Sequence, residues 1–126
     1  MDPQSAAPLR ILVIDDEVQV ARALRRMLTR SGFEVELAHS AADGMARFDA
    51  SMPQVVISDY YMPDRNGYEL VRDLMAKAPA TVAVLLSGSL DVSPDASRFC
   101  DVIWKPWNEP ELVDLIRRRL TERGAP

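Results

Sequence analysis

The sequence has 126 residues, of which 48% are hydrophobic and 27% are charged, and its formal net charge is −4. This length and composition fit one globular domain with its own core and leave little room for a second. The acidic balance disfavours a general nucleic-acid-binding or bilayer-binding surface. No apolar run is long enough to span a membrane, and the single cysteine, Cys100, excludes an internal disulfide framework. We therefore expect a cytoplasmic protein without a signal peptide, in which Cys100 is a small core residue.

The periodic part of the sequence sets the expected domain boundaries. Residues 1–8 contain two prolines and no apolar periodicity, which predicts a flexible arm. Ordered structure is expected from residue 9 to residue 121, as a single domain without repeats or an internal linker. Residues 122–126 are expected to form a short tail.

Two strand–helix units open the domain. Residues 11–14 form an apolar run of strand length that stops at a pair of aspartates, after which apolar residues recur at helical spacing. Gly32 is suited to the position just beyond the end of this helix. Residues 34–38 alternate between polar and apolar, which predicts a half-buried edge strand. Ser40, followed three residues later by an acid, predicts the N-cap of a second helix.

The third unit has a strand that is apolar on both faces. Residues 55–58 lead directly to a single carboxylate, Asp59, before a turn that contains proline. Gly67 lies among turn-forming residues and is able to take a positive φ, and a helix is predicted over residues 68–77. An aspartate at the end of a strand either bonds the next turn or carries chemistry, and this segment favours both interpretations equally.

Two more strands follow. Residues 81–86 predict a buried strand that ends at Ser87, and residues 102–104 predict the last strand, which leads to Lys105. A short fourth helix is expected over residues 93–99, because a serine and a proline at its start suit the N-cap and first helical positions.

The last helix completes the alternation of strands and helices. Asn108 suits its N-cap, and Trp107 can pack on Leu112 as a hydrophobic staple. Five strands that alternate with helical patterns predict an α/β fold. We expect a doubly wound parallel sheet with helices on both faces, since right-handed crossovers return each helix over the sheet.

One edge of this sheet collects the candidate functional residues. The carboxyl ends of parallel strands share an edge, and there the sequence places Asp15, Asp16, Asp59, Ser87 and Lys105. Three carboxylates within about 5 Å repel by roughly 3 kcal/mol per pair at an effective dielectric of about 20, which favours a bound cation. Oxygen ligands alone favour Mg²⁺ or Mn²⁺ over zinc. The set suits phosphoryl transfer to a carboxylate, with one acid as nucleophile.

Each of these residues also has an ordinary structural interpretation. Asp16 suits the N-cap of the first helix, with Gln19 at the third helical position. Lys105 would serve equally as a solvated strand end, and Ser87 as a turn residue. The coincidence of three acids, a hydroxyl and a cation at one edge favours the functional interpretation.

Four motifs follow one another in chain order: Ile14-Asp15-Asp16-Glu17, Ser58-Asp59-Tyr60-Tyr61-Met62-Pro63 with Asn66-Gly67, Leu86-Ser87-Gly88, and Lys105-Pro106. Together they resemble the receiver domain of bacterial two-component response regulators, including the chemotaxis regulators. The resemblance spans residues 9–120. It implies a flavodoxin-like, five-stranded parallel sheet with strand order 2-1-3-4-5.

For the phosphoryl group, the resemblance implies that Asp59 is the acceptor and that the donor is the histidine of a kinase or of a phosphotransfer protein. Ser87 and Lys105 would contact the phosphate, and the Lys105–Pro106 peptide bond would be cis. The chain would then be a signalling switch that assists its own phosphorylation and dephosphorylation, not an enzyme with a separate substrate.

For the metal, the resemblance implies Mg²⁺ bound by Asp16, Asp59 and the backbone carbonyl of Tyr61, with Asp15 holding a metal-bound water. Mn²⁺ is an alternative ion. The Tyr61 side chain either covers the phosphorylation site and sets the lifetime of the acyl phosphate or is a surface aromatic that serves only through its backbone.

Two features depart from the family pattern. Receivers usually carry an aromatic residue three positions before the lysine, where this chain has Val102, and Ser87 and Lys105 are closer together than is common by about one helical turn. We therefore expect the helix over residues 93–99 to be short or irregular. Trp104 should point away from Lys105 by strand alternation and supply the missing bulk. Receivers often signal or form homodimers through the face made by the fourth helix, the last strand and the last helix.

Other function classes fit parts of the pattern. A phosphatase of the haloacid dehalogenase type also places an aspartate after a buried strand, but it normally has a second acid two residues later, where this chain has Tyr61. A receiver that works unphosphorylated as an interaction module is the other alternative. A nucleotide-binding enzyme is disfavoured because no glycine-rich phosphate loop is present. His39, the only histidine, is assigned no phosphodonor role.

Overall fold

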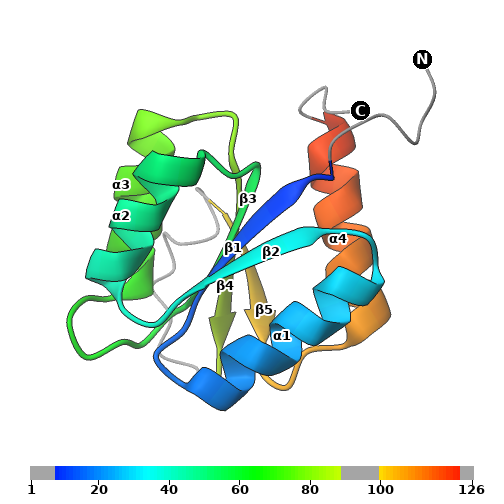
Figure 1. Ribbon diagram of the computed structural model, residues 1–126, viewed down its shortest axis with the longest axis horizontal. Coiled ribbons are helices and arrows are strands. Elements are labelled where there is room, and N and C mark those ends of the chain that lie inside the picture. The colour runs from blue at the N-terminus through cyan, green and yellow to red at the C-terminus, as the bar shows by residue number, and fades with distance from the viewer. Residues whose placement is uncertain (1–7, 89–99, 123–126) are drawn as a thin grey trace.

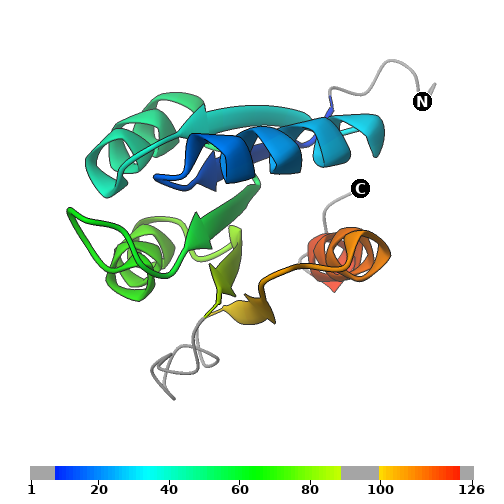
Figure 2. The same ribbon diagram turned by 90° about the horizontal axis from the view of Figure 1, so that it is seen from below.

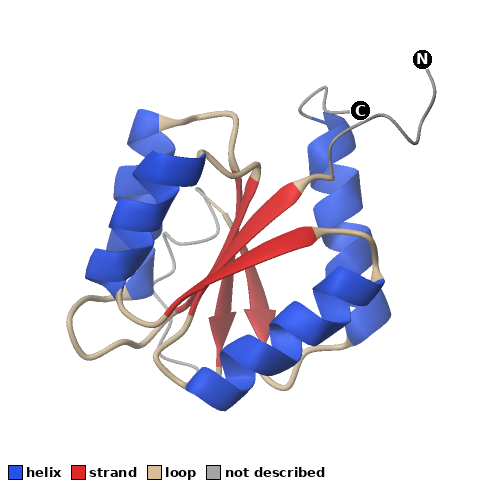
Figure 3. Ribbon diagram, in the orientation of Figure 1, coloured by secondary structure: helices blue, strands red, loops and turns tan. Residues whose placement is uncertain are grey.

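The computed structural model describes residues 8–88 and 100–122. Its strands are β1 (Arg10–Ile14), β2 (Glu34–Ala38), β3 (Val55–Asp59), β4 (Val82–Ser87) and β5 (Asp101–Trp104), and its helices are α1 (Val18–Arg30), α2 (Ala41–Ser51), α3 (Gly67–Lys77) and α4 (Glu109–Glu122). All strands are parallel and form one sheet in the order β2-β1-β3-β4-β5, seen in red in Figure 3. This arrangement confirms the predicted α/β fold and strand order.

The sheet separates two layers of helices. Helices α1 and α4 cover one face, and α2 and α3 lie side by side on the other (Figures 1 and 2). Alternate residues of β1 point to opposite faces, so Ile11 and Val13 pack in the α1/α4 layer while Leu12 and Ile14 pack in the α2/α3 layer. A strand that is buried on both faces reads as a continuous apolar run, which explains the pattern of β1, β3 and β4.

The end of α1 follows the prediction for Gly32. This glycine has a φ of +98°, a left-handed conformation that few other residues adopt readily. Its N–H donates to the Thr29 carbonyl at 3.0 Å, and the Phe33 N–H donates to the Leu28 carbonyl at 3.1 Å. These two bonds form a Schellman motif, which turns the chain from α1 into β2.

The predicted helix caps are present at α2 and α4. Ser40 Oγ accepts the Asp43 N–H at 3.0 Å, and the Asn108 side chain accepts a backbone N–H three residues later at 3.0 Å. At α1 the N-cap is Glu17, which makes no side-chain capping bond, so the interpretation of Asp16 as the N-cap is wrong. Asp16 therefore lies one residue before the N-cap.

Three predicted segments lie wholly or largely outside the described residues: most of the arm, the fourth helix over residues 93–99, and most of the tail. Glu122, which was predicted to begin the tail, is the last residue of α4. Within residues 8–88 and 100–122, no helix has the length and apolar character needed to cross a membrane.

Candidate functional site

The carboxyl edge of the sheet brings together four of the predicted site residues. Asp15 directly follows β1, Asp59 ends β3, Ser87 ends β4, and Lys105 directly follows β5. The strands pair in register up to these positions, so their ends lie next to one another. Asp15, Asp59 and Ser87 are at most 7% exposed. The functional groups are therefore built into the sheet edge, where the surrounding backbone limits their movement.

Lys105 bridges two of the buried carboxylates. Its Nζ atom lies 3.1 Å from Asp59 Oδ1 and 3.5 Å from Asp15 Oδ2. Burial alone lowers the pKa of Lys105, but the hydrogen bond with Asp59 and the charges of both carboxylates outweigh burial and raise it above its ordinary value. Lys105 is thus a fixed positive charge beside Asp59. The Lys105–Pro106 bond is cis, as the resemblance implies.

The carboxylates remain crowded despite this cation. Burial raises the pKa of Asp15, and the bonds from the Glu17 backbone N–H and from Lys105 only partly offset the effect. Burial also raises the pKa of Asp59, and the charges of Asp15 and Asp16 add to that rise. The edge therefore holds more negative charge than Lys105 balances, which is the electrostatic condition that favours a divalent cation.

Glu17 completes a group of carboxylates that suits such a cation. One carboxylate oxygen from each of Asp15, Glu17 and Asp59 lies within 4.8 Å of the other two. A set of oxygen ligands fits Mg²⁺ or Mn²⁺. Asp16, a predicted ligand, is not in this group, is half-buried and acts on Asp59 through its charge. Glu17 was not predicted as a ligand because it lies at the N-cap of α1, although three consecutive acids at a strand end were a signal for it.

Gly67 places the start of α3 against the backbone of Asp59. The Gly67 N–H donates to the Tyr60 carbonyl at 2.7 Å, and a Cβ atom at this position would lie 2.0 Å from the Asp59 carbonyl oxygen. Its φ is not positive, so the glycine is needed here for close approach and not for a left-handed conformation. Asn66 caps the helix by accepting the Tyr68 N–H at 2.7 Å.

Asp64 ties the loop between β3 and α3 to α2. Its two carboxylate oxygens accept the N–H groups of Ala41 and Ala42 at 3.1 and 3.0 Å. These hydrogen bonds lower the pKa of Asp64. The loop that follows Asp59 is therefore anchored at the starts of two helices, an arrangement that keeps Asp59 in a defined position.

Two tyrosines follow Asp59 and differ in burial. Tyr60 is 4% exposed, and its N–H donates to the Leu86 carbonyl at 2.9 Å. Tyr61 is 47% exposed, and its ring meets the Tyr60 ring edge-on with the centroids 4.8 Å apart. The Tyr61 side chain therefore stands at the surface, two residues from Asp59, and its carbonyl stays a predicted metal ligand.

The residues at the start of β5 pack on the face covered by α2 and α3. Val102 and Cys100 contact the cluster of Tyr60, Val71, Ala83 and Leu85. Burial raises the pKa of the Cys100 thiol to about 12, so the thiol stays neutral, in keeping with the predicted core role. Trp104 is 49% exposed, whereas Lys105 reaches inward to the acids.

Residues 11–117, which include the site residues described above, match the family model of the response regulator receiver domain. Two mycobacterial proteins are similar along most of the chain. The transcriptional regulatory protein TrcR of Mycobacterium tuberculosis is 29% identical over 115 residues, covering 88% of this chain and 45% of TrcR. The response regulator MprA of Mycolicibacterium vanbaalenii is 31% identical over 126 residues, covering 94% of this chain and 54% of MprA. The chain thus spans about half the length of these relatives.

Solved structures agree with this match. A receiver domain protein from Methanospirillum hungatei superposes with a TM-score of 0.85 at 27% identity, covering 94% of this chain and 98% of that one. A receiver domain protein from Clostridium thermocellum gives a TM-score of 0.86 at 25% identity, covering 92% and 97%. The matched residues include the whole carboxyl-edge group, which argues against the phosphatase alternative. The chain belongs to the response regulator receiver domain family.

Proposed function

We propose that residues 9–121 form a phosphorylation-dependent switch of a two-component system, in which Asp59 accepts a phosphoryl group from a histidine kinase or a phosphotransfer protein. The observation that carries the proposal is the 3.1 Å contact between Lys105 Nζ and Asp59 Oδ1 inside a group of three carboxylates. Membership of the receiver family supports it. The chain works in the cytoplasm as a phosphoacceptor, without binding nucleic acid directly.

The chemistry is an in-line transfer between two nucleophiles. A carboxylate oxygen of Asp59 forms a bond to phosphorus while the phosphorus–nitrogen bond of the donor histidine breaks, and the imidazole nitrogen keeps the electron pair. Lys105 holds Asp59 through Oδ1 and offsets negative charge on the phosphoryl oxygens. Ser87, buried at the end of β4, donates a hydrogen bond from its hydroxyl to one of those oxygens.

The acidic group recruits the metal for this step. Asp15, Glu17 and Asp59 would hold Mg²⁺ or Mn²⁺, with Asp16 and the Tyr61 carbonyl as the further ligands that the resemblance implies. A bound divalent cation supplies charge that stabilises the phosphoryl oxygens during transfer. The raised pKa values of Asp15 and Asp59 support this role, since a cation offsets the cost that burial imposes on the charged carboxylates.

The phosphorylated state is read out on the face formed by the predicted fourth helix, β5 and α4. Tyr60 directly follows Asp59 and packs in the same cluster as Val102 on β5, and this shared packing supports the proposal. Pairing of two copies through β5 and α4 is the output to test first, by comparing sedimentation with and without the phosphodonor.

Intact-mass measurement tests the acceptor directly. The purified chain is incubated with Mg²⁺ and acetyl phosphate, and the wild type should gain one phosphoryl group that EDTA prevents. Asp59→Asn should gain none, while Asp114→Asn, an exposed carboxylate on α4, should behave as the wild type. If the wild type stays unmodified or Asp59→Asn is labelled equally, the proposal is wrong and the unphosphorylated interaction module replaces it.

A further inference from the structure

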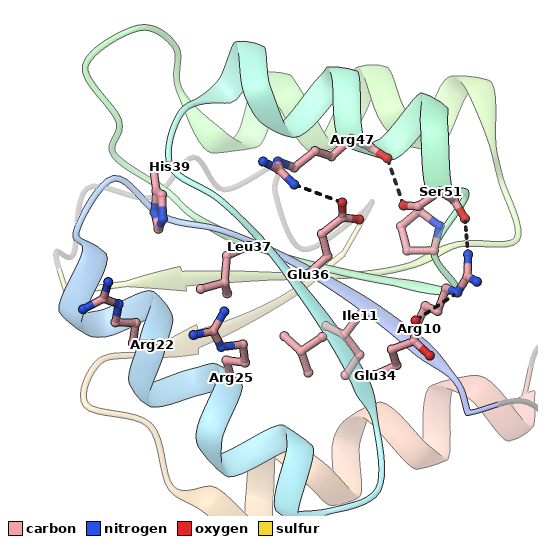
Figure 4. Close-up of a pocket in the computed structure, with 12 residues that line it drawn as sticks. Arg10, Ile11, Arg22, Arg25, Glu34, Glu36, Leu37, His39, Arg47 and Ser51 are labelled. Atoms are coloured by element: carbon pink, nitrogen blue, oxygen red, sulfur yellow. Dashed lines mark hydrogen bonds and ion pairs between the residues drawn. The ribbon is translucent and has the colours of Figure 1, made fainter.

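The outer edge of β2 borders a groove that the phosphoacceptor site does not use. The groove has a volume of about 630 Å³ and is lined by residues of α1, β2 and α2 (Figure 4). Within the described sheet, β2 pairs with β1 alone. An unpaired edge presents backbone donors and acceptors to which an extended peptide can add as a further strand.

The backbone of β2 determines which groups face this groove. In a parallel pair, alternate residues of a strand bond to the same neighbour. The Glu34 N–H donates to the Leu9 carbonyl at 2.9 Å, and the Ala38 carbonyl accepts the N–H of the residue after β1 at 3.0 Å. Val35 and Leu37 alternate with these positions, and both line the groove. Their N–H and C=O groups therefore face outward, which offers two donors and two acceptors.

Charged side chains flank this edge from both sides. On the α2 side, Arg47 pairs with Glu36 at 3.1 Å, and at the start of the sheet Arg10 pairs with Glu34 at 3.6 Å (Figure 4). These two pairs neutralise the glutamates of β2 itself. The charges that lie along the strand are therefore already balanced.

The α1 side of the groove carries unbalanced positive charge. Arg22 and Arg25 are exposed, lie on the α1 side of the groove in Figure 4, and form no ion pair with any residue in the described ranges. Four arginines and two glutamates line the groove, which leaves an excess of two positive charges on a chain whose net charge is −4. An occupant that complements this excess must be anionic.

We propose that the groove binds an extended acidic peptide of a partner protein, which adds a strand beside β2 and places carboxylates against Arg22 and Arg25. Alternate side chains of a strand share one face about 6.6 Å apart, and two residues three positions apart on a helix share one face about 4.5 Å apart along its axis. The reach of arginine side chains spans this difference. Acids at alternate positions of the peptide would therefore meet both arginines.

The placement of the charges argues against a merely protective role. Charges that prevent unwanted edge pairing belong on the edge strand itself. Here the charges of β2 are neutralised, and the excess lies on α1, beside the strand. That position leaves the backbone of Val35 and Leu37 accessible while favouring an acidic occupant. The inference is independent of whether Asp59 accepts phosphate.

The test uses the whole chain labelled with ¹⁵N and four probes. The first probe is a capped octapeptide of sequence Thr-Glu-Val-Glu-Thr-Glu-Val-Glu, the second has Lys in place of Glu, and the third keeps the glutamates but has Pro at each alternate position. The fourth is ATP, a compact polyanion. We expect saturable shifts of the Val35 and Leu37 amides with the first probe alone, at a dissociation constant below about 1 mM.

Matched variants separate the specific arginines from general charge. Arg22→Gln combined with Arg25→Gln should weaken the acidic peptide about tenfold. Arg26→Gln combined with Arg118→Gln removes the same charge from exposed positions outside the groove and should leave affinity within about twofold. Circular dichroism checks that both variants fold.

Three outcomes would overturn the proposal. Equal binding of the proline-containing peptide or of ATP would mean that the groove recognises charge without strand pairing. Absence of binding by the acidic peptide would leave the charges as solvated surface groups. Equal weakening by the two double variants would show that Arg22 and Arg25 have no specific role.

Discussion

Two groups of charged residues in this chain use similar chemistry in opposite environments. At the carboxyl edge, Lys105 contacts two buried carboxylates whose pKa values burial raises, so their charged forms are less favourable than they would be in water. At the start of β5, Arg119 makes a bidentate pair with Asp101 at 2.8 and 2.9 Å near the surface, and this hydrogen bonding raises the pKa of Arg119. The first group is therefore held at a desolvation cost, whereas the second pair keeps part of its hydration and changes stability little.

Gly67→Ala should lower the free energy of unfolding most, because it disturbs the backbone of Asp59, one of the buried carboxylates that Lys105 contacts. A Cβ atom there would lie 2.0 Å from the Asp59 carbonyl oxygen, so α3 or β3 must shift. We expect the free energy of unfolding in urea to fall by about 3 kcal/mol. Labelling by acetyl phosphate should slow in parallel.

Gly88→Ala is the matched control at the same edge. Its Cβ atom would meet nothing closer than Lys105 Cβ at 3.9 Å, an ordinary contact. If the two alanine variants unfold at the same urea concentration, close packing of α3 on Asp59 does not position the acceptor.

Lys105→Met should have the next largest effect, because it leaves Asp15 and Asp59 without their cation. Breaking a fully buried ion pair costs more than this, but the site opens at a sheet edge. We therefore expect the free energy of unfolding to fall by about 2 kcal/mol at pH 7. The loss should shrink as pH falls, because Asp15 and Asp59, whose pKa values are raised, take up protons. Urea unfolding at pH 7 and at pH 5 measures the loss of stability and its dependence on pH. A loss that is independent of pH would mean that packing of the lysine stem, not its charge, is responsible.

Asp59→Asn should act in the opposite direction and raise stability. Because the folded-state pKa of Asp59 lies above its ordinary value of 3.8, the folded chain binds this proton more tightly than the unfolded chain. Stability therefore declines as pH rises from about 3.8 through the raised pKa, and the full penalty is present above it. Asparagine does not titrate, so in EDTA at pH 7 the variant should unfold at a higher urea concentration than the wild type.

A pH series between about 3 and 8 checks the sign of that prediction. The difference between Asp59→Asn and the wild type should be small at the acidic end and grow with pH. Asp114→Asn, at an exposed position, should follow the wild type throughout. A variant that is less stable than the wild type at pH 7 would show that the Lys105 contact outweighs burial and repulsion.

The sequence predicts the position of the carboxyl-edge residues because the topology of a parallel sheet determines where the strand ends lie. A strand buried on both faces reads as an apolar run, so its end is visible, and parallel pairing brings the ends of β1, β3, β4 and β5 together. Asp59 and Lys105 follow from that rule alone. Glu17 does not, because its approach to the site depends on how α1 leaves β1.

Contacts between distant segments are the part that sequence patterns do not encode. Asp64 caps α2 from another loop, and Gly67 is required by a carbonyl eight residues earlier in the chain, not by its own φ. The groove beside β2 likewise depends on α1 and α2 meeting the edge strand, which no local motif records. Such features are fixed by packing geometry, so they appear only when the elements are placed.

Arg119→Gln should change the free energy of unfolding least, and it tests the surface pair against the buried group of Lys105. The pair with Asp101 lies near the surface, where water competes for both groups and ordering two long side chains costs entropy. The variant should unfold close to the wild type at low ionic strength, and the remaining difference should vanish near about 1 M salt. The loss in Lys105→Met should persist in the same salt, since a buried pair is screened less. If Arg119→Gln costs as much as Lys105→Met, the bidentate pair holds β5 to α4, and burial does not distinguish the two groups.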